Sequence, residues 1–221
     1  WETFNRIYSK LKMPFYPVPG NHDTLDDRAK LNRDELGDLL ESSVKNWQLA
    51  DKLSGKKTAN RTALFTHFTG KKPYYAVEKN DCVFLCLNTG VASVDPEQLK
   101  WLRAELERTK DAKHVFVLGH YPVLTAFGGN VRNSESRIIL SLLKKYKVAA
   151  YLSGHRHRYN YRMHEGVMHI MFQTACTELD AQPGGICEGG KVGAHAFSHL
   201  VSEDGGARWR RIDDALKPTV G

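Results

Sequence analysis

The sequence has few cysteines and no long apolar run, and both absences exclude whole classes of protein. Its 221 residues include only four cysteines, which is too few for the disulfide framework of a small secreted domain. No apolar stretch approaches the roughly 20 residues that a helix needs to cross a membrane. We therefore expect a single globular domain over residues 1–221, large enough for a substantial core and without a membrane segment.

The charge balance is basic but not concentrated. Lys and Arg number 32 against 25 Asp and Glu, which gives a net charge of +7 and favours anionic ligands. The lysines are scattered in short pairs such as Lys56-Lys57 and Lys144-Lys145. A nucleic-acid groove needs a continuous basic track with stacking aromatics, so nucleic acid is not indicated as a partner.

Helical patterns and short apolar runs alternate along the chain. We expect strands at 15–18, 74–78, 82–88, 115–118 and 148–152, and helices at 1–12, within 26–54, from Pro96 with Asp95 as N-cap, and at 134–146. The segments 159–163, 167–173, 195–201 and 207–212 then read as successive antiparallel strands. This order predicts an α/β layered sandwich.

Three short motifs follow predicted buried strands. They are Gly20-Asn21-His22-Asp23, Gly119-His120 and Gly154-His155-Arg156-His157. Ligands of α/β sheets bind at the carboxyl ends of the strands, so motifs far apart in sequence can meet there. Imidazoles and amide oxygens suit Zn, Mn, Fe or Ni better than Ca. The motifs therefore predict a metal site at one edge of the sheet.

In this order and spacing, the motifs resemble those of the calcineurin-like metallophosphoesterase family. The resemblance extends over nearly the whole chain and includes Gln98-Leu99-Lys100-Trp101-Leu102. It implies a four-layer α/β/β/α sandwich with two divalent metal ions, Mn, Fe, Zn or Ni, at the strand ends. By the same resemblance Asn21, His120 and His155 bind one metal, and His157 binds the other.

The resemblance also implies a catalytic pair and a reaction. His22 contacts the phosphate and protonates the leaving oxygen, while Asp23 orients His22. The reaction is hydrolysis of a small phosphomonoester or phosphodiester by a hydroxide activated by two metals. Arg156 and Tyr121 lie near the same strand end, so we expect them to contact the substrate.

One part of the family pattern is missing. The family also carries Asp-x-His and Gly-Asp motifs before Gly-Asn-His-Asp, and residues 1–19 match neither, since Glu2 is their only acidic residue. We therefore expect the sequence to be an N-terminally truncated piece of a longer enzyme. Without the bridging carboxylate, this chain should bind at most one metal and be poorly active.

Two other functions fit the same fold. One is a nuclease of the same family, which the scattered charge disfavours. The other is a non-catalytic interaction module, which the missing acidic motifs make credible. The pair His22 and Asp23 favours an enzyme, because a binding module needs no proton donor.

Overall fold

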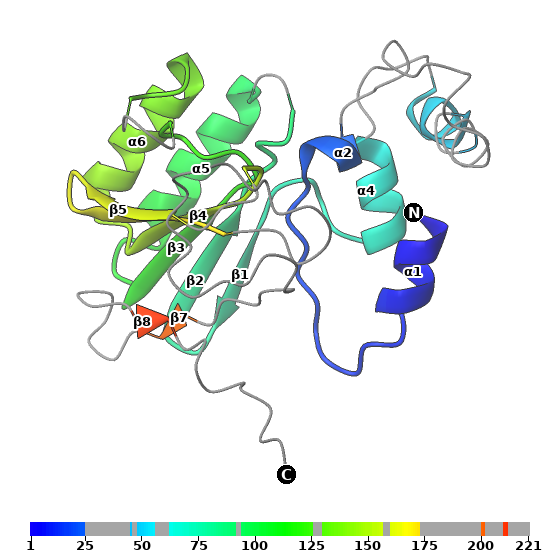
Figure 1. The fold of residues 1–221 in the computed structure, drawn as a ribbon, viewed down its shortest axis with the longest axis horizontal. Helices are drawn as coiled ribbons and strands as arrows, with labels where there is room; N and C mark the ends of the chain where they lie inside the picture. The colour runs from blue at the N-terminus through cyan, green and yellow to red at the C-terminus, as the bar shows by residue number, and fades with distance from the viewer. Residues whose placement is uncertain are drawn as a thin grey trace, which may run out of the picture.

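The computed structural model describes residues 1–24, 45, 48–55, 62–91, 94–125, 130–156, 160–172, 200–201 and 210–211 (Figure 1). Its centre is a six-stranded mixed sheet in the order β1-β2-β3-β4-β6-β5. The strands are β1 (Tyr75–Lys79), β2 (Cys82–Cys86), β3 (His114–Leu118), β4 (Ala150–Ser153), β5 (Asn160–His164) and β6 (Val167–Met171). The four central strands run parallel, and the edge strands β1 and β5 run antiparallel to their neighbours.

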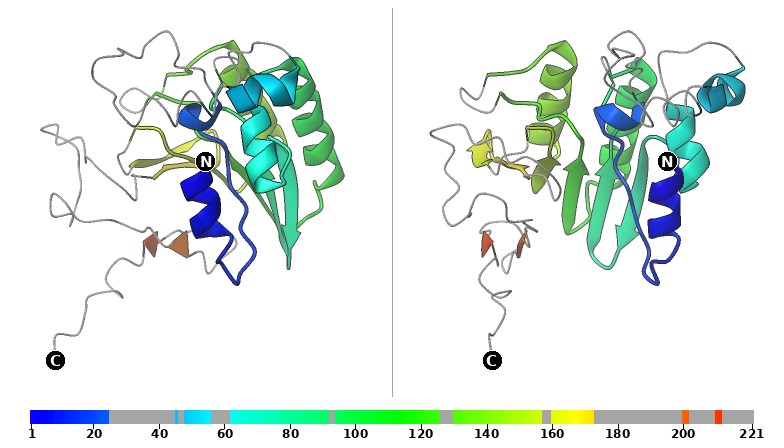
Figure 2. Two further views of the ribbon diagram at one scale, coloured as in Figure 1. Left: turned by 90° about the vertical axis from the view of Figure 1, so that its right-hand side faces the viewer. Right: turned by 45° about the vertical axis from the view of Figure 1, so that its right-hand side comes forward.

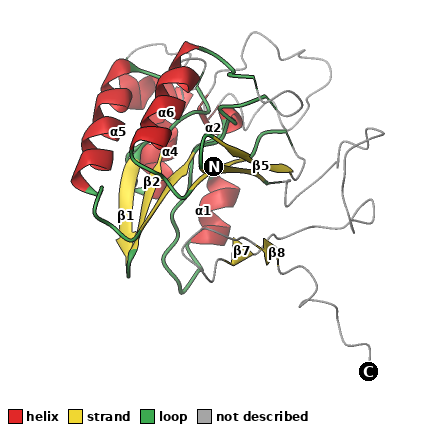
Figure 3. Cartoon of the chain, turned by 90° about the vertical axis from the view of Figure 1, so that its left-hand side faces the viewer, coloured by secondary structure: helices red, strands yellow, loops and turns green. Residues whose placement is uncertain are grey.

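Helices α5 (Pro96–Arg108) and α6 (Ser134–Lys145) cover one face of this sheet (Figure 3). Each begins at a side-chain cap: Asp95 accepts a hydrogen bond from the Gln98 N–H at 2.7 Å, and Asn133 accepts one from the Ser136 N–H at 2.8 Å. Such caps satisfy backbone donors that the first helical turn leaves free. The leucines and isoleucines of both helices pack on the valines and leucines of β2 and β3 to form the core.

The N-terminal part lies beside β1 and contains α1 (Glu2–Tyr8), α2 (Asn21–Thr24) and α4 (Thr62–Thr69) (Figures 1 and 2). No residue of α1 is buried. Instead the Trp1 ring stacks on Phe68 of α4, with ring centroids 5.6 Å apart. The Tyr75 hydroxyl donates to the Pro17 carbonyl at 2.7 Å and attaches this segment to the edge of the sheet. The segment is therefore held by a few long-range contacts rather than by strand pairing.

The α/β class and the mixed sheet with flanking helices confirm the predicted fold class. The hairpin of β1 and β2, the cap at Asp95, and the antiparallel pairing of β5 with β6 are also as expected. The predicted segments 195–201 and 207–212 are described only as β7 (Leu200–Val201) and β8 (Arg210–Arg211), which pair antiparallel. Of the predicted helical segment 26–54, residues 48–54 are helical, while 26–44 lie outside the described residues.

Three expectations about elements were wrong or incomplete. Residues 15–18 form no strand, because Pro17 and Pro19 lack the N–H that a sheet ladder needs. Strand β6 pairs parallel with β4, so the strands after β4 are not simply successive antiparallel neighbours. The helix α4 was not anticipated, although it buries Leu64 and Phe65.

Within the described helices, none is both long and apolar enough to span a bilayer.

A buried histidine on β6 makes stability depend on pH. His169 is only 8% exposed, and no described group hydrogen-bonds to its Nε2 atom. Burial, followed by the charges of His164 and Arg162, lowers the pKa of His169 from 6.5 to about 4. Between these two pH values the unfolded chain therefore binds a proton at His169, and the folded chain does not. The free energy of unfolding consequently decreases as pH falls through that range.

We expect the wild-type free energy of unfolding to drop by about 2 kcal/mol between pH 7 and pH 5 through this residue alone. Replacing His169→Leu should remove that part of the pH dependence, as measured by urea unfolding at both pH values. His67→Leu, at an exposed position of α4, is the matched control and should leave the dependence unchanged. An identical pH dependence in the His169→Leu variant would contradict the assignment.

Candidate metal centre

The parallel hydrogen-bond pattern continues past the ends of the strands and brings two motifs together. The Leu87 N–H donates to the Leu118 carbonyl at 2.8 Å, and the Gly119 N–H donates to the Leu152 carbonyl at 2.9 Å. One step further, the Gly154 N–H donates to the His120 carbonyl at 3.0 Å. These bonds fix the loops after β3 and β4 side by side, so that His120 and His155 leave the sheet at the same edge.

Three of the predicted metal ligands converge. The Nε2 atom of His120 lies 2.7 Å from the Oδ1 atom of Asn21 and 3.3 Å from the Nδ1 atom of His155. An amide oxygen only accepts hydrogen bonds, so this contact requires a proton on Nε2 of His120. A metal held by the same two atoms would replace that proton. The sequence separation of 99 residues between Asn21 and His120 shows that the fold, and not local sequence, makes this contact.

The donor set fits a divalent metal. At zinc–nitrogen distances of about 2.0–2.1 Å, two nitrogens of a tetrahedral site lie roughly 3.4 Å apart, close to the spacing of the two histidine nitrogens. Two imidazoles and one amide oxygen also suit Mn, Fe or Ni. Among the described residues no group of three or more His, Cys, Asp or Glu side chains gathers closely enough to hold a metal. The third donor here is an amide, and His157 lies outside the described residues.

A tight turn positions Asn21 and His22. The Gly20 N–H donates to the Asp23 carboxylate at 2.8 Å, while the Gly20 carbonyl accepts from the Asp23 N–H at 3.1 Å and the Thr24 hydroxyl at 2.9 Å. His22 is exposed and Asp23 is half-buried. Asp23 thus anchors the turn itself, a contact that the sequence did not predict. Its predicted role in orienting His22 remains a prediction.

Backbone contact between two glycines fixes where this turn lies. A Cβ atom at Gly90 would lie 2.4 Å from the carbonyl carbon of Gly20 and 2.8 Å from the Asn21 nitrogen. A Cβ atom at Gly20 would in turn lie 3.2 Å from the His120 ring. The segment after β2 can therefore approach the turn that carries Asn21 only because Gly90 has no side chain, while Gly20 leaves room for the His120 ring.

Gln98 supports the same segment and was missed as a positioning residue. It is 1% exposed, its Oε1 accepts from the Asn88 N–H at 2.7 Å, and its Nε2 donates to the Asn88 carbonyl at 3.2 Å. The spacing Asp95-x-x-Gln98 resembles a capping box, in which the glutamine would turn back to its own helix. Here the side chain instead continues the sheet ladder beyond β2 and holds the chain that leads to Gly90.

Tyr121 lies against the two histidines. Its N–H donates to the Thr89 hydroxyl at 3.0 Å, its carbonyl accepts from the Tyr151 hydroxyl at 2.8 Å, and its ring centroid is 4.2 Å from that of His155. Tyr151 is buried, and burial raises the pKa of its hydroxyl, which therefore stays a neutral donor. Tyr121 is thus held by its backbone, which fixes its ring beside the site.

The loop after β4 carries the remaining predicted residues. His155 has a φ of 71°, a left-handed backbone that non-glycine residues adopt at a cost, and the fold imposes it at the position of a predicted ligand. Arg156 follows, exposed, with its N–H donating to the Gly154 carbonyl at 2.9 Å. The structure therefore places Arg156 on the loop that carries His155, and its contact with a substrate remains a prediction.

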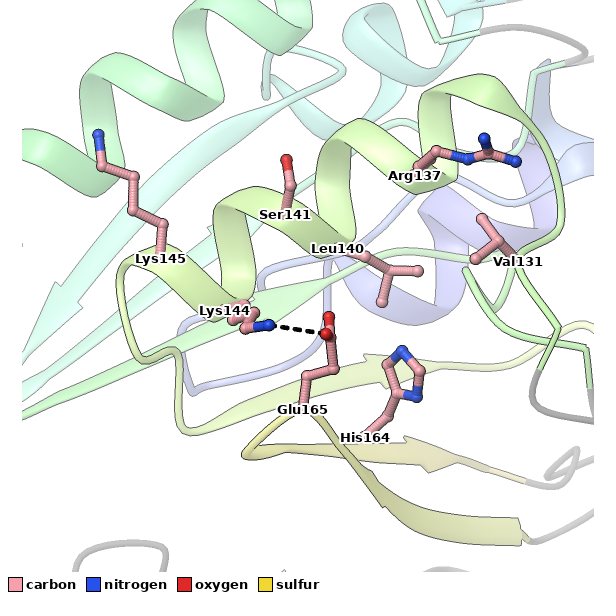
Figure 4. Close-up of a pocket in the computed structure, with 8 residues that line it drawn as sticks. All are labelled: Val131, Arg137, Leu140, Ser141, Lys144, Lys145, His164 and Glu165. Atoms are coloured by element: carbon pink, nitrogen blue, oxygen red, sulfur yellow. Dashed lines mark hydrogen bonds and ion pairs between the residues drawn. The ribbon is translucent and has the colours of Figure 1, made fainter.

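A separate groove lies on α6 and the turn between β5 and β6 (Figure 4). None of the predicted site residues lines it. Its most prominent polar contact is the ion pair between Lys144 and Glu165, at 2.7 Å, with both side chains partly exposed. Such pairs contribute little to stability or binding, so the groove does not compete with the strand ends as a candidate site.

The fold and the family profile together identify the class of protein as a metallophosphoesterase. Residues 1–159 match the sequence profile of the calcineurin-like phosphoesterase family, and the chain belongs to that family. Membership implies a dinuclear metal centre in general terms, without identifying the metal.

The curated relatives are acid phosphatases. The pig protein Tartrate-resistant acid phosphatase type 5 (Sus scrofa) is 25% identical over 194 residues, which cover 81% of this chain and 52% of the relative. Its human counterpart (Homo sapiens) is 28% identical over 190 residues, covering 77% and 52%. The chain spans about half the length of these relatives. Among solved structures, GAP50, the anchor in the inner membrane complex of Plasmodium, aligns with a TM-score of 0.38 and 22% identity over 46% of this chain and 38% of that one.

The contact between Gly90 and Gly20 is directly testable. Gly90→Ala should push the turn carrying Asn21 away from His120 and lower the affinity for Mn or Zn by roughly tenfold or more, as for other losses of ligand support. Gly154→Ala is the matched control, because a Cβ there meets no described atom within 4 Å. Calorimetric metal titrations of both variants would show the difference. Equal affinities would mean that the glycine contact does not position Asn21.

Proposed function

We propose that this protein hydrolyses small phosphate esters, monoesters or diesters, in a metal-dependent reaction. The observation that supports this most directly is the convergence of Asn21, His120 and His155 at the carboxyl edge of the parallel strands. Family membership and the distant similarity to acid phosphatases support the same reaction class.

We infer that the three converging donors hold one divalent cation, and that His157 is a ligand of a second position that these residues alone do not fill. A cation in such a site polarises a phosphoryl oxygen and promotes ionisation of water near neutral pH. The amide oxygen of Asn21 and the two imidazoles are neutral when they bind, so the cation keeps most of its charge for the substrate. With these ligands alone, we expect at most one metal to bind.

His22 is the proposed proton donor. It directly follows the ligand Asn21 in α2 and is exposed, so a bound substrate can reach its ring. Imidazole is the side chain that most often transfers protons near neutral pH, and an alkoxide leaving group needs a proton as its bond to phosphorus breaks. Asp23 holds the turn from which His22 projects. Arg156 and Tyr121 are proposed to contact the phosphate ester.

The reaction class can be tested on the full-length protein. After removal of metal, the protein should hydrolyse p-nitrophenyl phosphate or its bis ester when Mn, Zn, Fe or Ni is added, and a chelator should abolish turnover. His120→Ala should show no metal-dependent rate, because it removes the central donor. Absence of turnover with every metal and both esters would contradict the proposed function.

A second experiment separates the proton donor from the ligands. His22→Ala should reduce kcat by about 100-fold or more, the usual contribution of a general acid, with metal content unchanged. His120→Ala should lose bound metal together with activity. Metal content is measured by plasma mass spectrometry after dialysis. Loss of metal from the His22→Ala protein would show that His22 is a ligand rather than an acid.

A further inference from the structure

An arginine outside the predicted motifs is folded back onto the site. Beyond Tyr121, Leu124 and Val131 form an antiparallel bridge. The Arg132 N–H donates to the Val123 carbonyl at 3.1 Å, and α6 begins directly afterwards at the cap Asn133. The backbone of Arg132 is thus fixed on both sides, although 11 positions separate it from Tyr121.

The side chain of Arg132 lies over the Tyr121 ring. Its guanidinium carbon is 3.9 Å from the ring centroid, a close cation–π contact. The same ring centroid is 4.2 Å from that of His155. The guanidinium and the imidazole of a proposed metal ligand therefore lie no further apart than the sum of these two distances. One ring thus contacts both groups, which places Arg132 at the rim of the proposed metal site.

The charge of Arg132 is not neutralised within the part of the chain that the structure describes. The residue is exposed, and no described carboxylate forms an ion pair with it. Stacking on an aromatic ring orients the plane of a guanidinium but leaves its N–H groups available for hydrogen bonds in that plane. A cation held beside a cationic metal site is repelled unless an anion lies between them.

We propose that Arg132 is a substrate-binding residue that makes the site prefer phosphomonoesters over phosphodiesters. The proposal rests on the proposed function. A guanidinium binds two phosphate oxygens at once when both are free and charged. A monoester dianion keeps three non-bridging oxygens, so two remain for Arg132 when one contacts a metal. A diester has only two non-bridging oxygens and a single charge, so it gains less from the contact.

The test compares Arg132→Ala with Arg137→Ala. Arg137 lies on the exposed side of α6, lines the separate groove of Figure 4 and contacts no site residue there. Arg132→Ala should lower kcat/KM for p-nitrophenyl phosphate roughly 10- to 100-fold, mainly through KM, as expected for loss of a charged bidentate contact. The value for the bis ester should change less than about threefold, since the diester depends less on this contact. Arg132→Lys should restore only part of the loss, and metal content should not change.

Binding of inorganic phosphate provides a readout that does not depend on turnover. By calorimetry on the metal-loaded protein, phosphate affinity should fall about tenfold or more in Arg132→Ala and stay unchanged in Arg137→Ala. If the wild-type protein is active but Arg132→Ala keeps the same monoester preference and the same phosphate affinity, the inference about Arg132 is overturned. The proposed function would still stand. If the wild-type protein shows no turnover, the proposed function fails, and phosphate affinity still decides whether Arg132 binds the anion. Tyr121→Leu, which removes the ring under Arg132, should weaken phosphate binding in the same direction.

Discussion

The contact between the backbones of Gly90 and Gly20 determines where the metal centre can form. The turn that carries Asn21 belongs to no sheet, so strand pairing cannot position it. It is placed by this contact, by the bond between Tyr75 and the Pro17 carbonyl, and by the hydrogen bond from His120 to Asn21. The rest of the site extends from the parallel strands. The centre is therefore a junction between a rigid sheet edge and a separately anchored turn.

Support for this junction comes from side chains that touch no ligand. Gln98 extends the hydrogen-bond ladder past β2 through Asn88, and Tyr151 holds the backbone of Tyr121. Both side chains are buried and neutral, so they fix the position of the backbone without adding charge near the metal-binding donors. The two arginines of the site, Arg132 and Arg156, are in contrast exposed at its rim. Buried residues thus set the geometry, and exposed residues lie where the proposed anionic substrate would bind.

The sequence predicted those parts of the molecule that local pattern controls. Apolar runs predicted β2 and β3, and the Asp95 cap marked α5. Of the predicted metal ligands, the structure brings Asn21, His120 and His155 together. Pro17 and Pro19 argue against a strand at 15–18, but the prediction gave more weight to the apolar side chains of this segment. The pairing of β6 with β4 and the fold-back of Arg132 depend on contacts between distant segments. No local pattern encodes such contacts, so they required the structure.

The wide separation of the ligands along the chain has a consequence for assembly. Asn21 and His120 are 99 positions apart in sequence, and His155 joins from 35 positions further on. Closing loops of this length costs conformational entropy that only the completed sheet repays. No proteolytic fragment confined to one half of the chain contains the three donors. Affinity for a metal at these donors would consequently report whether the part of the fold that joins Asn21 to His155 has formed.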